Sequence, residues 1–426
     1  MPIPTSAPIR RVAVLTLGCK LNQADSEAIA RELVARGCDV IDRPSAADAY
    51  IINTCSVTHV SDRKSRHLVR LARRLGAPGA PVALVGCYPE TAGLEVAQRT
   101  GADLVLGNRD KLAVVESLLG HGRAASEVTV RPLRTRAFVK AQEGCNDVCA
   151  FCIVPRTRGR EVSVPIDRVV AEVARREAAG VQEVVITGTQ LGAYGRDIGA
   201  RLPDLIRALL AETSAPRIRC SSLQPQDITP ELVGLWEDPR LCRHFHLALQ
   251  SGCDATLVRM RRRYDTRMYR EAVELIRAAV PGAAITTDVI VGFPGETDEE
   301  FEQSLAFCED MAFAGMHVFP YSRRPGTTAD KLPGHVPPEV KRERVRRMLA
   351  LAEASARRFR MAHVDRVVSV LWEGRARGTD EGDVWEGLTD DYVRVRARSR
   401  ANLMNRITGA RVLADGPGYV EAQALV

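Results

Sequence analysis

Three cysteines that lie close together in the sequence have the type and spacing needed for metal chemistry. Cys145, Cys149 and Cys152, here called the loop trio, form the pattern C-x3-C-x2-C between Gly144 and Pro155. Three thiolates at this spacing can bind three irons of a 4Fe-4S cubane and leave the fourth iron open to a small molecule. A structural zinc site needs four protein ligands. The alternatives are therefore a zinc site completed by a remote residue, or three incidental cysteines.

A second set of cysteines follows apolar runs near the N-terminus. Cys19, Cys55 and Cys87, here called the strand-edge trio, each come directly after a segment with the composition of a buried strand. In an open parallel sheet, ligands bind beyond the carboxyl ends of the strands, so these ends would bring the three thiols to one edge. Gly18 and Gly86 would let the backbone approach closely there. We expect a second three-cysteine site, the alternative being three separate buried thiols.

The elements that must position the strand-edge trio alternate between apolar runs and helical periodicity. The predicted strands are 11–17, 49–54, 81–85 and 102–106, and two of the predicted helices are 26–36 and 61–75. Buried strands alternating with helices are typical of a parallel, doubly wound sheet.

The loop trio directly follows the first strand of a longer series. The predicted strands are 137–141, 183–187, 217–220, 245–249, 285–291 and 316–320, with helices such as 168–177 and 300–311 between them. Six such units indicate a partial (β/α)6 barrel, in which functional residues lie at the carboxyl ends of the strands.

The last part of the chain consists of short β-rich runs separated by glycine turns, which indicates a small five-stranded barrel. The predicted fold class is therefore α/β with three domains. These are an N-terminal parallel α/β domain over 10–125, a central partial (β/α)6 barrel over 134–362, and a C-terminal β-barrel over 363–426.

Composition narrows the functional class. The chain has no apolar stretch of about 18 residues and no signal-peptide pattern at its start, so we expect a cytoplasmic protein without membrane spans. Its 11 cysteines are then thiols or ligands and not disulfides. The net charge of +7 favours an anionic partner such as RNA. Five cysteines outside the trios are expected to be structural thiols: Cys38, Cys220, Cys242, Cys253 and Cys308.

Several motifs, taken together, resemble the methylthiotransferases of the radical S-adenosylmethionine (SAM) class over nearly the whole chain. They are Thr16-Leu17-Gly18-Cys19-Lys20, Asn53-Thr54-Cys55, Gly86-Cys87, Gly144-Cys145, Cys152-Ile153-Val154-Pro155, Arg158-Gly159, Leu249-Gln250-Ser251-Gly252, 260–264 and 287–297. The terminal barrel resembles the TRAM domain, an RNA-binding module.

The resemblance implies two 4Fe-4S clusters and two SAM molecules. The strand-edge trio would hold an auxiliary cluster whose open iron carries the sulfur, and one SAM would methylate that sulfur. The loop trio would hold the cluster at which a second SAM is cleaved to a radical that activates a C–H bond. No acid–base residue is expected to be catalytic.

The resemblance also implies SAM contacts in the central barrel. The candidates are Phe151, Thr187, Gly188, Gln250, Asp288 and Gly292. The alternative for each is an ordinary polar loop residue or turn glycine. His246 and His317 are expected to lie in the core or in a pocket wall and not to bind iron.

Three branches of the family differ in substrate: isopentenyladenosine in tRNA, threonylcarbamoyladenosine in tRNA, or an aspartate of a ribosomal protein. Segments 18–23, 221–225 and 317–327 resemble the threonylcarbamoyladenosine branch, whereas 24–27 is closer to the aspartate branch. We therefore expect methylthio transfer to the 2-position of threonylcarbamoyladenosine at position 37 of tRNA, next to the anticodon. The other two branches, and a radical SAM methylase without sulfur insertion, are the alternatives.

The expected partners are the anticodon loop of tRNA, an electron donor such as flavodoxin or ferredoxin, and a sulfur donor that the sequence does not identify. Lys341 and seven arginines over 342–360 favour a phosphate-binding track, the alternative being a solvated helix face. Asp391 stands where the TRAM barrel commonly has asparagine, which would weaken contact with RNA.

Overall fold

The computed structural model describes residues 8–120, 135–379 and 382–426. These residues divide into two compact units. The first contains 8–120, 143–162 and 322–330, and the second contains 135–142, 163–321, 331–379 and 382–426. The predicted domain boundaries at 125 and 134 lie outside the described residues, and the three domain ranges remain a prediction.

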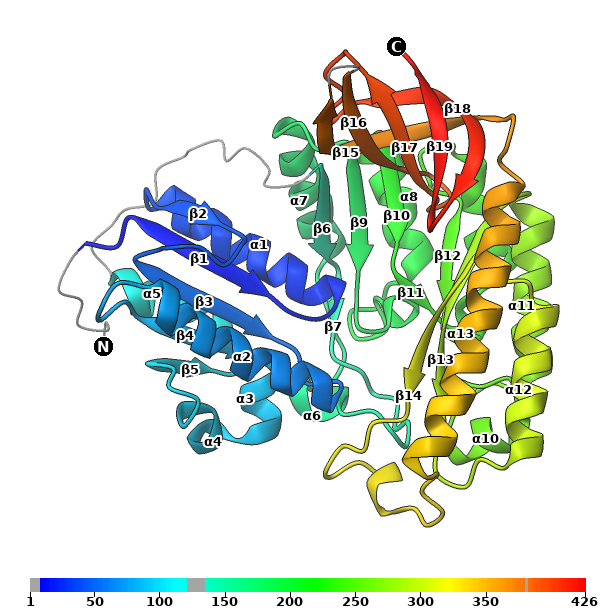
Figure 1. Ribbon diagram of the computed structural model, residues 1–426, viewed down its shortest axis with the longest axis horizontal. Helices are drawn as coiled ribbons and strands as arrows, with labels where there is room; N and C mark the ends of the chain where they lie inside the picture. The colour runs from blue at the N-terminus through cyan, green and yellow to red at the C-terminus, as the bar shows by residue number, and fades with distance from the viewer. Residues whose placement is uncertain (1–7, 121–134, 380–381) are drawn as a thin grey trace. The chain divides into compact units, whose positions relative to one another are not determined.

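The first unit is built on a parallel five-stranded sheet in the order β2-β1-β3-β4-β5 (Figure 1). In chain order its elements are β1 (Arg11–Thr16), α1 (Lys20–Ala35), β2 (Asp39–Ile41), β3 (Ala49–Thr54), α2 (His59–Leu75), β4 (Val82–Gly86), α3 (Cys87–Ala92), α4 (Leu94–Gln98), β5 (Leu104–Leu106), η1 (Lys111–Ala113), α5 (Val114–Leu119) and α6 (Val154–Arg158). All four predicted strands are present. The sequence missed β2, which is too short to show a periodic pattern.

Apolar side chains cover both faces of this sheet. Val12 and Val14 pack into one core with α1 and α5, whereas Ala13 and Leu15 pack into another with α2. This alternation is the period of two that strand geometry imposes. Because β3 and β4 are buried along their whole lengths, they form continuous apolar runs. The sheet is therefore doubly wound, as predicted.

The second unit contains two parallel sheets, in the orders β10-β9-β6 and β11-β12-β13-β14 (Figure 1). In chain order the elements from β6 onward, α6 apart, are β6 (Arg136–Lys140), β7 (Gln142–Glu143), β8 (Val162–Ser163), α7 (Ile166–Ala178), β9 (Glu183–Thr187), η2 (Leu191–Ala193), α8 (Leu202–Glu212), β10 (Arg217–Cys220), β11 (Ser222–Leu223), η3 (Pro225–Asp227), α9 (Pro230–Val233), η4 (Gly234–Glu237), β12 (His244–Leu247), α10 (Asp254–Arg259), α11 (Thr266–Ala279), β13 (Ala284–Val291), α12 (Asp298–Asp310), β14 (Gly315–Pro320), η5 (Ala329–Lys331) and α13 (Pro338–Met361). All six predicted strands are present, so the partial (β/α)6 barrel is confirmed. Its wall is divided where β10 ends at Cys220 and β11 begins at Ser222.

Five strands after α13 close into a small barrel in the order β15-β16-β17-β19-β18, as predicted (Figure 1). They are β15 (Val367–Thr379), β16 (Gly382–Thr389), β17 (Arg394–Ser399), β18 (Ile407–Gly416) and β19 (Tyr419–Leu425). In β17 the arginines are exposed while Val395 and Ala397 are buried, which is the pattern of a strand with one face on a core. Among the described helices, none is both long and apolar enough to cross a membrane.

Two expectations about RNA contact change with the structure. The Asp391 carboxylate is buried and accepts hydrogen bonds from His363 Nε2, at 2.7 Å, and from the Thr389 hydroxyl, so it does not face a ligand outside the barrel. Most of the basic side chains of α13 form ion pairs with carboxylates: Arg344, Arg346, Arg347, Arg357 and Arg360. Of the helix's eight predicted cations, most are therefore partly neutralised, and Arg342 and Arg358 remain exposed.

Candidate functional site

The strand-edge trio lies at the carboxyl edge of the first unit's sheet. Cys19 follows β1 and caps the start of α1, Cys55 follows β3, and Cys87 is the first residue of α3 after β4. Because β1, β3 and β4 are neighbours in the sheet, their ends are adjacent. The structure thus brings together three cysteines that are far apart in the sequence.

Two glycines make this close approach possible. Gly18 has a φ of +102°, and a Cβ there would lie 2.6 Å from Cys55 Cβ and 3.0 Å from its Sγ. Gly86 has a φ of +97°, and a Cβ there would lie 2.6 Å from Asn53 Oδ1. Both positions combine a backbone conformation that side chains disfavour with a lack of space, so they require glycine.

The thiols of the strand-edge trio affect one another. Cys55 and Cys87 are each 7% exposed, whereas Cys19 is exposed. The pKa of Cys55 is raised to about 11, chiefly by burial; the negative charges of Cys87 and Cys19 contribute to the rise, against hydrogen bonds from the Val57 backbone and the Ser61 side chain. Three thiolates so close together repel one another, and a bound metal would relieve that repulsion because it binds the deprotonated form.

Side-chain amides hold the segments that carry this trio. Asn22 Nδ2 donates to Leu17 O at 2.6 Å and to Thr54 O at 2.9 Å, which joins the segments before Cys19 and Cys55. Asn108 Nδ2 lies 3.5 Å from Cys87 Sγ and donates to Thr157 O at 2.7 Å. The sequence analysis missed both asparagines, since neither stands in a pattern that distinguishes it from a loop asparagine.

The loop trio is shaped by local backbone contacts. Gly144 has a φ of +75°, and a Cβ there would lie 1.9 Å from Arg160 O. The amide of Cys145 donates to Gly159 O at 3.1 Å, and that of Cys152 donates to Cys149 O at 3.1 Å. All three thiols are partly exposed. A small molecule can therefore approach this loop.

Hydrogen bonding and charge within the loop resemble those of the first trio. The amide of Asp147 donates to Cys145 Sγ at 3.4 Å. Burial raises the pKa of Cys145 to about 12, against that hydrogen bond, and the negative charges of Asp147, Cys152 and Cys149 contribute to the rise. An amide that points at a sulfur stabilises a thiolate and is a common feature of iron–sulfur ligation.

The donor sets of both trios fit iron–sulfur clusters better than single ions. Among the described residues, no group of three or more His, Cys, Asp or Glu side chains is arranged to hold one metal ion. In a cubane each thiolate binds a different iron, so its ligands surround the cluster instead of meeting at a point. Three thiols in each trio, with an amide directed at one sulfur of each, suit a cluster with one open iron.

The predicted SAM contacts fall in both units. Phe151 lies in the loop of the first unit, whereas the other five lie in the second. Thr187, Gly188, Gln250 and Gly292 end or follow strands, and Asp288 lies within β13. The structure brings Gln250 and Asp288 together, because the amide of Gln250 donates to Asp288 O at 2.8 Å. Gln250 has a φ of +70°, and this strained conformation is often found at binding sites.

Other polar groups surround these positions. His246 Nε2 lies 3.2 Å from Asp288 Oδ2, and its ring centroid lies 6.1 Å from that of His317. The amide of Gly292 donates to Glu296 Oε1 at 2.9 Å, so this donor is already used within the protein. Asp288 and His246 therefore form a polar pair between the neighbouring strands β12 and β13.

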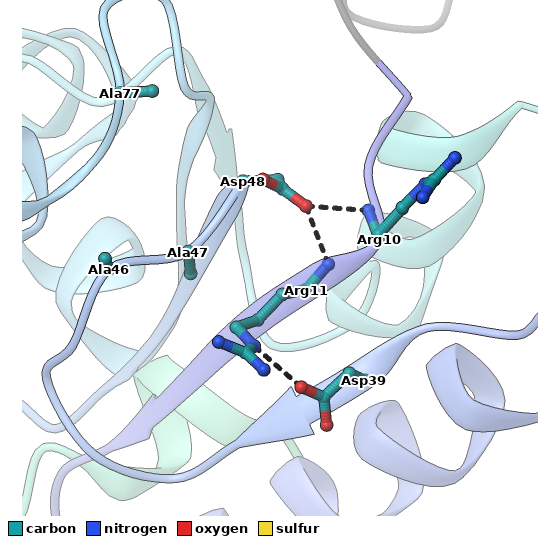
Figure 2. Close-up of a pocket in the computed structure, with 7 residues that line it drawn as sticks. All are labelled: Arg10, Arg11, Asp39, Ala46, Ala47, Asp48 and Ala77. Carbon is teal, nitrogen blue, oxygen red and sulfur yellow. Dashed lines mark hydrogen bonds and ion pairs between the residues drawn. The ribbon is translucent and has the colours of Figure 1, made fainter.

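The opposite, amino-terminal edge of the first unit's sheet carries a different kind of pocket. Figure 2 shows Arg10, Arg11, Asp39 and Asp48 lining it together with small alanine side chains. Asp48 Oδ2 accepts from the amides of Arg10 and Arg11 at 2.9 and 2.8 Å, and Arg11 Nε donates to Asp39 Oδ2 at 2.6 Å (Figure 2). The two carboxylates are thus hydrogen-bonded to the Arg10 and Arg11 amides and to the Arg11 side chain. None of the residues that line this pocket is a cysteine or histidine.

Comparisons with known proteins agree with this geometry. The radical SAM superfamily model matches residues 139–308, and the model of the uncharacterized protein family UPF0004 matches residues 11–107. In fold, the chain is similar to TsrM, a radical SAM methyltransferase from Kitasatospora setae. The TM-score is 0.54 with 15% identity, over 75% of this chain and 77% of that one.

Curated relatives match nearly the whole length. The threonylcarbamoyladenosine tRNA methylthiotransferase MtaB of Bacillus subtilis is 35% identical, over 97% of this chain and 96% of the relative. The tRNA-2-methylthio-N(6)-dimethylallyladenosine synthase of Anaeromyxobacter dehalogenans is 39% identical, over 88% of this chain and 86% of the relative. At this identity and coverage, the chain belongs to the radical SAM tRNA methylthiotransferase family, a family of transferases that use SAM and a 4Fe-4S cluster.

Proposed function

We propose that this enzyme adds a methylthio group to the 2-position of threonylcarbamoyladenosine at position 37 of tRNA, using two 4Fe-4S clusters and two SAM molecules. The observation that carries the chemistry is the presence of two separate cysteine trios in one compact unit. The threonylcarbamoyladenosine substrate is supported by the relative from B. subtilis, which aligns with 97% of the chain.

In this proposal the two trios have different tasks. The strand-edge trio holds the cluster that carries sulfur, and the loop trio holds the cluster at which SAM binds. When bound, these groups supply the sulfur atom and the one-electron cleavage of SAM. The chain contributes ligands, orientation and a site that excludes competing hydrogen donors.

The predicted SAM contacts have corresponding tasks. Phe151 contacts the adenine of SAM, and the predicted contacts in the second unit also bind SAM: Thr187, Gly188, Gln250, Asp288 and Gly292. Two exposed arginines of α13, Arg342 and Arg358, together with Arg394 of the small barrel, contact tRNA phosphates. The electron donor is a flavodoxin or ferredoxin, and the enzyme works in the cytoplasm with a sulfur donor still to be found.

A second substrate deserves a test because a relative named for dimethylallyladenosine matches at 39% identity. We would reconstitute the protein without oxygen and supply SAM and a reductant. Two tRNA pools would be used, one with threonylcarbamoyladenosine and one with dimethylallyladenosine, both lacking the methylthio group. Mass spectrometry of the nucleosides would then identify the product.

The expected result is 2-methylthio-threonylcarbamoyladenosine from the first pool and little product from the second. Cys19→Ala and Cys145→Ala should each abolish the product, because each removes a ligand from one trio. Cys38→Ala is the matched control: this buried thiol belongs to neither trio, and its Sγ lies 3.9 Å from Ile9 O. Product from the dimethylallyladenosine pool alone would refute the proposed substrate.

A further inference from the structure

A buried network of charges in the first unit lies outside both trios. Lys111 Nζ donates to the Asp25 carboxylate, and the two side chains are each 3% exposed. Arg158 Nη1 donates to Glu143 Oε1 at 2.5 Å and lies 3.7 Å from Asp25 Oδ2. Buried charges are costly unless they are paired, so such a network is retained where it stabilises or serves something.

Arg158 connects the two cysteine-bearing regions. It ends α6, the helix that directly follows the loop trio. Its guanidinium donates to the side-chain oxygen of Asn22, the residue whose amide holds the segments before Cys19 and Cys55. The backbone oxygen of the adjacent Thr157 accepts from Asn108, whose amide also reaches Cys87 Sγ.

The charge of Arg158 acts on the strand-edge trio. Its side chain is 3% exposed, so solvent screens it little. Burial disfavours the charged guanidinium, yet its pKa is raised, because negative charge on Cys87 and Cys19, and then on Glu143 and Asp25, favours the charged form. Arg158 is thus a buried cation that contacts Asn22, the side chain that joins the segments before Cys19 and Cys55.

We propose that Arg158 is a positioning residue for the strand-edge trio. The charge of Arg158 raises the reduction potential of the cluster bound there and stabilises the anionic sulfur that this cluster carries. This inference rests on the proposed function, because it requires a cluster at Cys19, Cys55 and Cys87. A nearby positive charge stabilises the reduced, more negative cluster. Arg158 follows the loop trio in the chain and donates to Asn22, so it also connects the segments that carry the two trios.

The test isolates one cluster in the full-length protein. Cys145, Cys149 and Cys152 are all replaced by alanine, so that any cluster must be at the strand-edge trio. The midpoint potential is then measured by an anaerobic redox titration followed by electron paramagnetic resonance. Arg158→Gln, Arg158→Lys and Arg160→Gln are compared in this background. Arg160 is the matched control because it is an exposed arginine of the same segment.

We expect Arg158→Gln to shift the potential to more negative values, Arg158→Lys to restore most of it, and Arg160→Gln to leave it unchanged. Equal potentials in Arg158→Gln and the background would overturn the inference, as would equal shifts at positions 158 and 160. If Arg158→Gln binds no iron, Arg158→Lys decides: iron binding with a near-normal potential supports the role of the charge, and loss of iron overturns it. A background without any cluster would instead refute the second cluster of the proposed function, and the inference with it.

Discussion

The two cysteine trios carry the same donors but reach their geometry by different routes. The loop trio occupies one short loop whose shape is fixed by Gly144 and by backbone hydrogen bonds within 145–159. The strand-edge trio is assembled from the ends of β1, β3 and β4, and its members span residues 19 to 87. One site therefore depends on a turn, and the other depends on the strand order of a whole sheet.

The two routes also give different exposure. All three thiols of the loop trio are partly open to solvent, whereas the strand-edge trio combines an exposed thiol, Cys19, with two buried ones, Cys55 and Cys87. The loop trio is therefore evenly accessible, and the strand-edge trio is open on one side only. The comparison teaches that the position of a thiol in the fold, and not its type, sets its exposure.

The largest expected effect comes from removing the buried ion pair between Lys111 and Asp25, which belongs to the charge network of the first unit. Lys111→Met removes the cation that donates to the buried Asp25 carboxylate, whereas Arg158 Nη1 lies 3.7 Å from Asp25 Oδ2. We expect the free energy of unfolding to fall by about 3 kcal/mol, because a buried charge loses its main partner. Iron at the strand-edge trio should be lost, while iron at the loop trio should remain.

Chemical denaturation and iron analysis would check this. Arg11→Met is the control, since Arg11 and Asp39 pair at the other edge of the same sheet and are more than half exposed. An exposed pair contributes about 0–1 kcal/mol. Equal decreases in the free energy of unfolding in Lys111→Met and Arg11→Met would show that the burial of an ion pair does not determine how much it stabilises this unit.

A smaller effect is expected from replacing the glycine next to each trio, because each replacement should affect iron binding at one trio only. Gly18→Ala and Gly144→Ala each place a Cβ where no space exists, at 2.6 Å from Cys55 Cβ and 1.9 Å from Arg160 O respectively. The strained backbone alone costs about 1–3 kcal/mol. We expect each variant to lose the iron of its own trio and to keep that of the other, as measured by iron content and electron paramagnetic resonance.

Gly37→Ala is the matched control for both glycine variants. Gly37 has a φ of +80°, so alanine is strained there too, but its Cβ would meet no atom within 4 Å. Iron content should therefore stay at the wild-type value. Loss of iron in Gly37→Ala would mean that backbone strain, and not the steric contact of the added Cβ, governs both sites.

The smallest effect is the pH dependence of stability that comes from the His363–Asp391 pair in the second unit. It should leave iron binding at both trios unchanged. Burial opposes the charged form of His363, but its hydrogen bond and ion pair with Asp391 outweigh this and raise the pKa of His363. Burial also opposes the charged form of Asp391, yet the same partner, with Thr389 and Arg243, lowers the pKa of Asp391. The pair is therefore most stabilising between the ordinary values of the two groups, about pH 4 to about pH 6.5.

The sign of the pH dependence follows from these shifts. Stability from His363 is complete below its unfolded pKa and is lost as the pH rises through its raised folded pKa. Stability from Asp391 is lost as the pH falls through its lowered folded pKa. His363→Gln should remove the decline on the alkaline side, as monitored by tryptophan fluorescence during denaturation of the apoprotein. An unchanged decline in this variant would assign it to another group.

Local patterns in the sequence predicted most of the elements. Runs of apolar residues in β3 and β4, the helical period of α2 and the cysteine spacing of the loop trio all act within a few residues, so they can be read directly. The strand-edge trio also became a prediction, because each cysteine directly follows a predictable strand. The short β2 and the division of the barrel wall at Cys220 and Ser222 were missed, since neither carries a periodic signal.

Only the tertiary structure decided which polar side chains meet. The amide of Asn22 joins two strand ends, Arg158 donates to the side-chain oxygen of Asn22, and the carboxylate of Asp391 turns inward to His363. Likewise, five arginines of α13 are paired with carboxylates, so the basic run in the sequence overstated the free positive charge. The sequence by itself determined the elements and the ligand types because these depend on near neighbours. Charge partners depend on residues far apart in the chain, and they are settled only when those residues pack together.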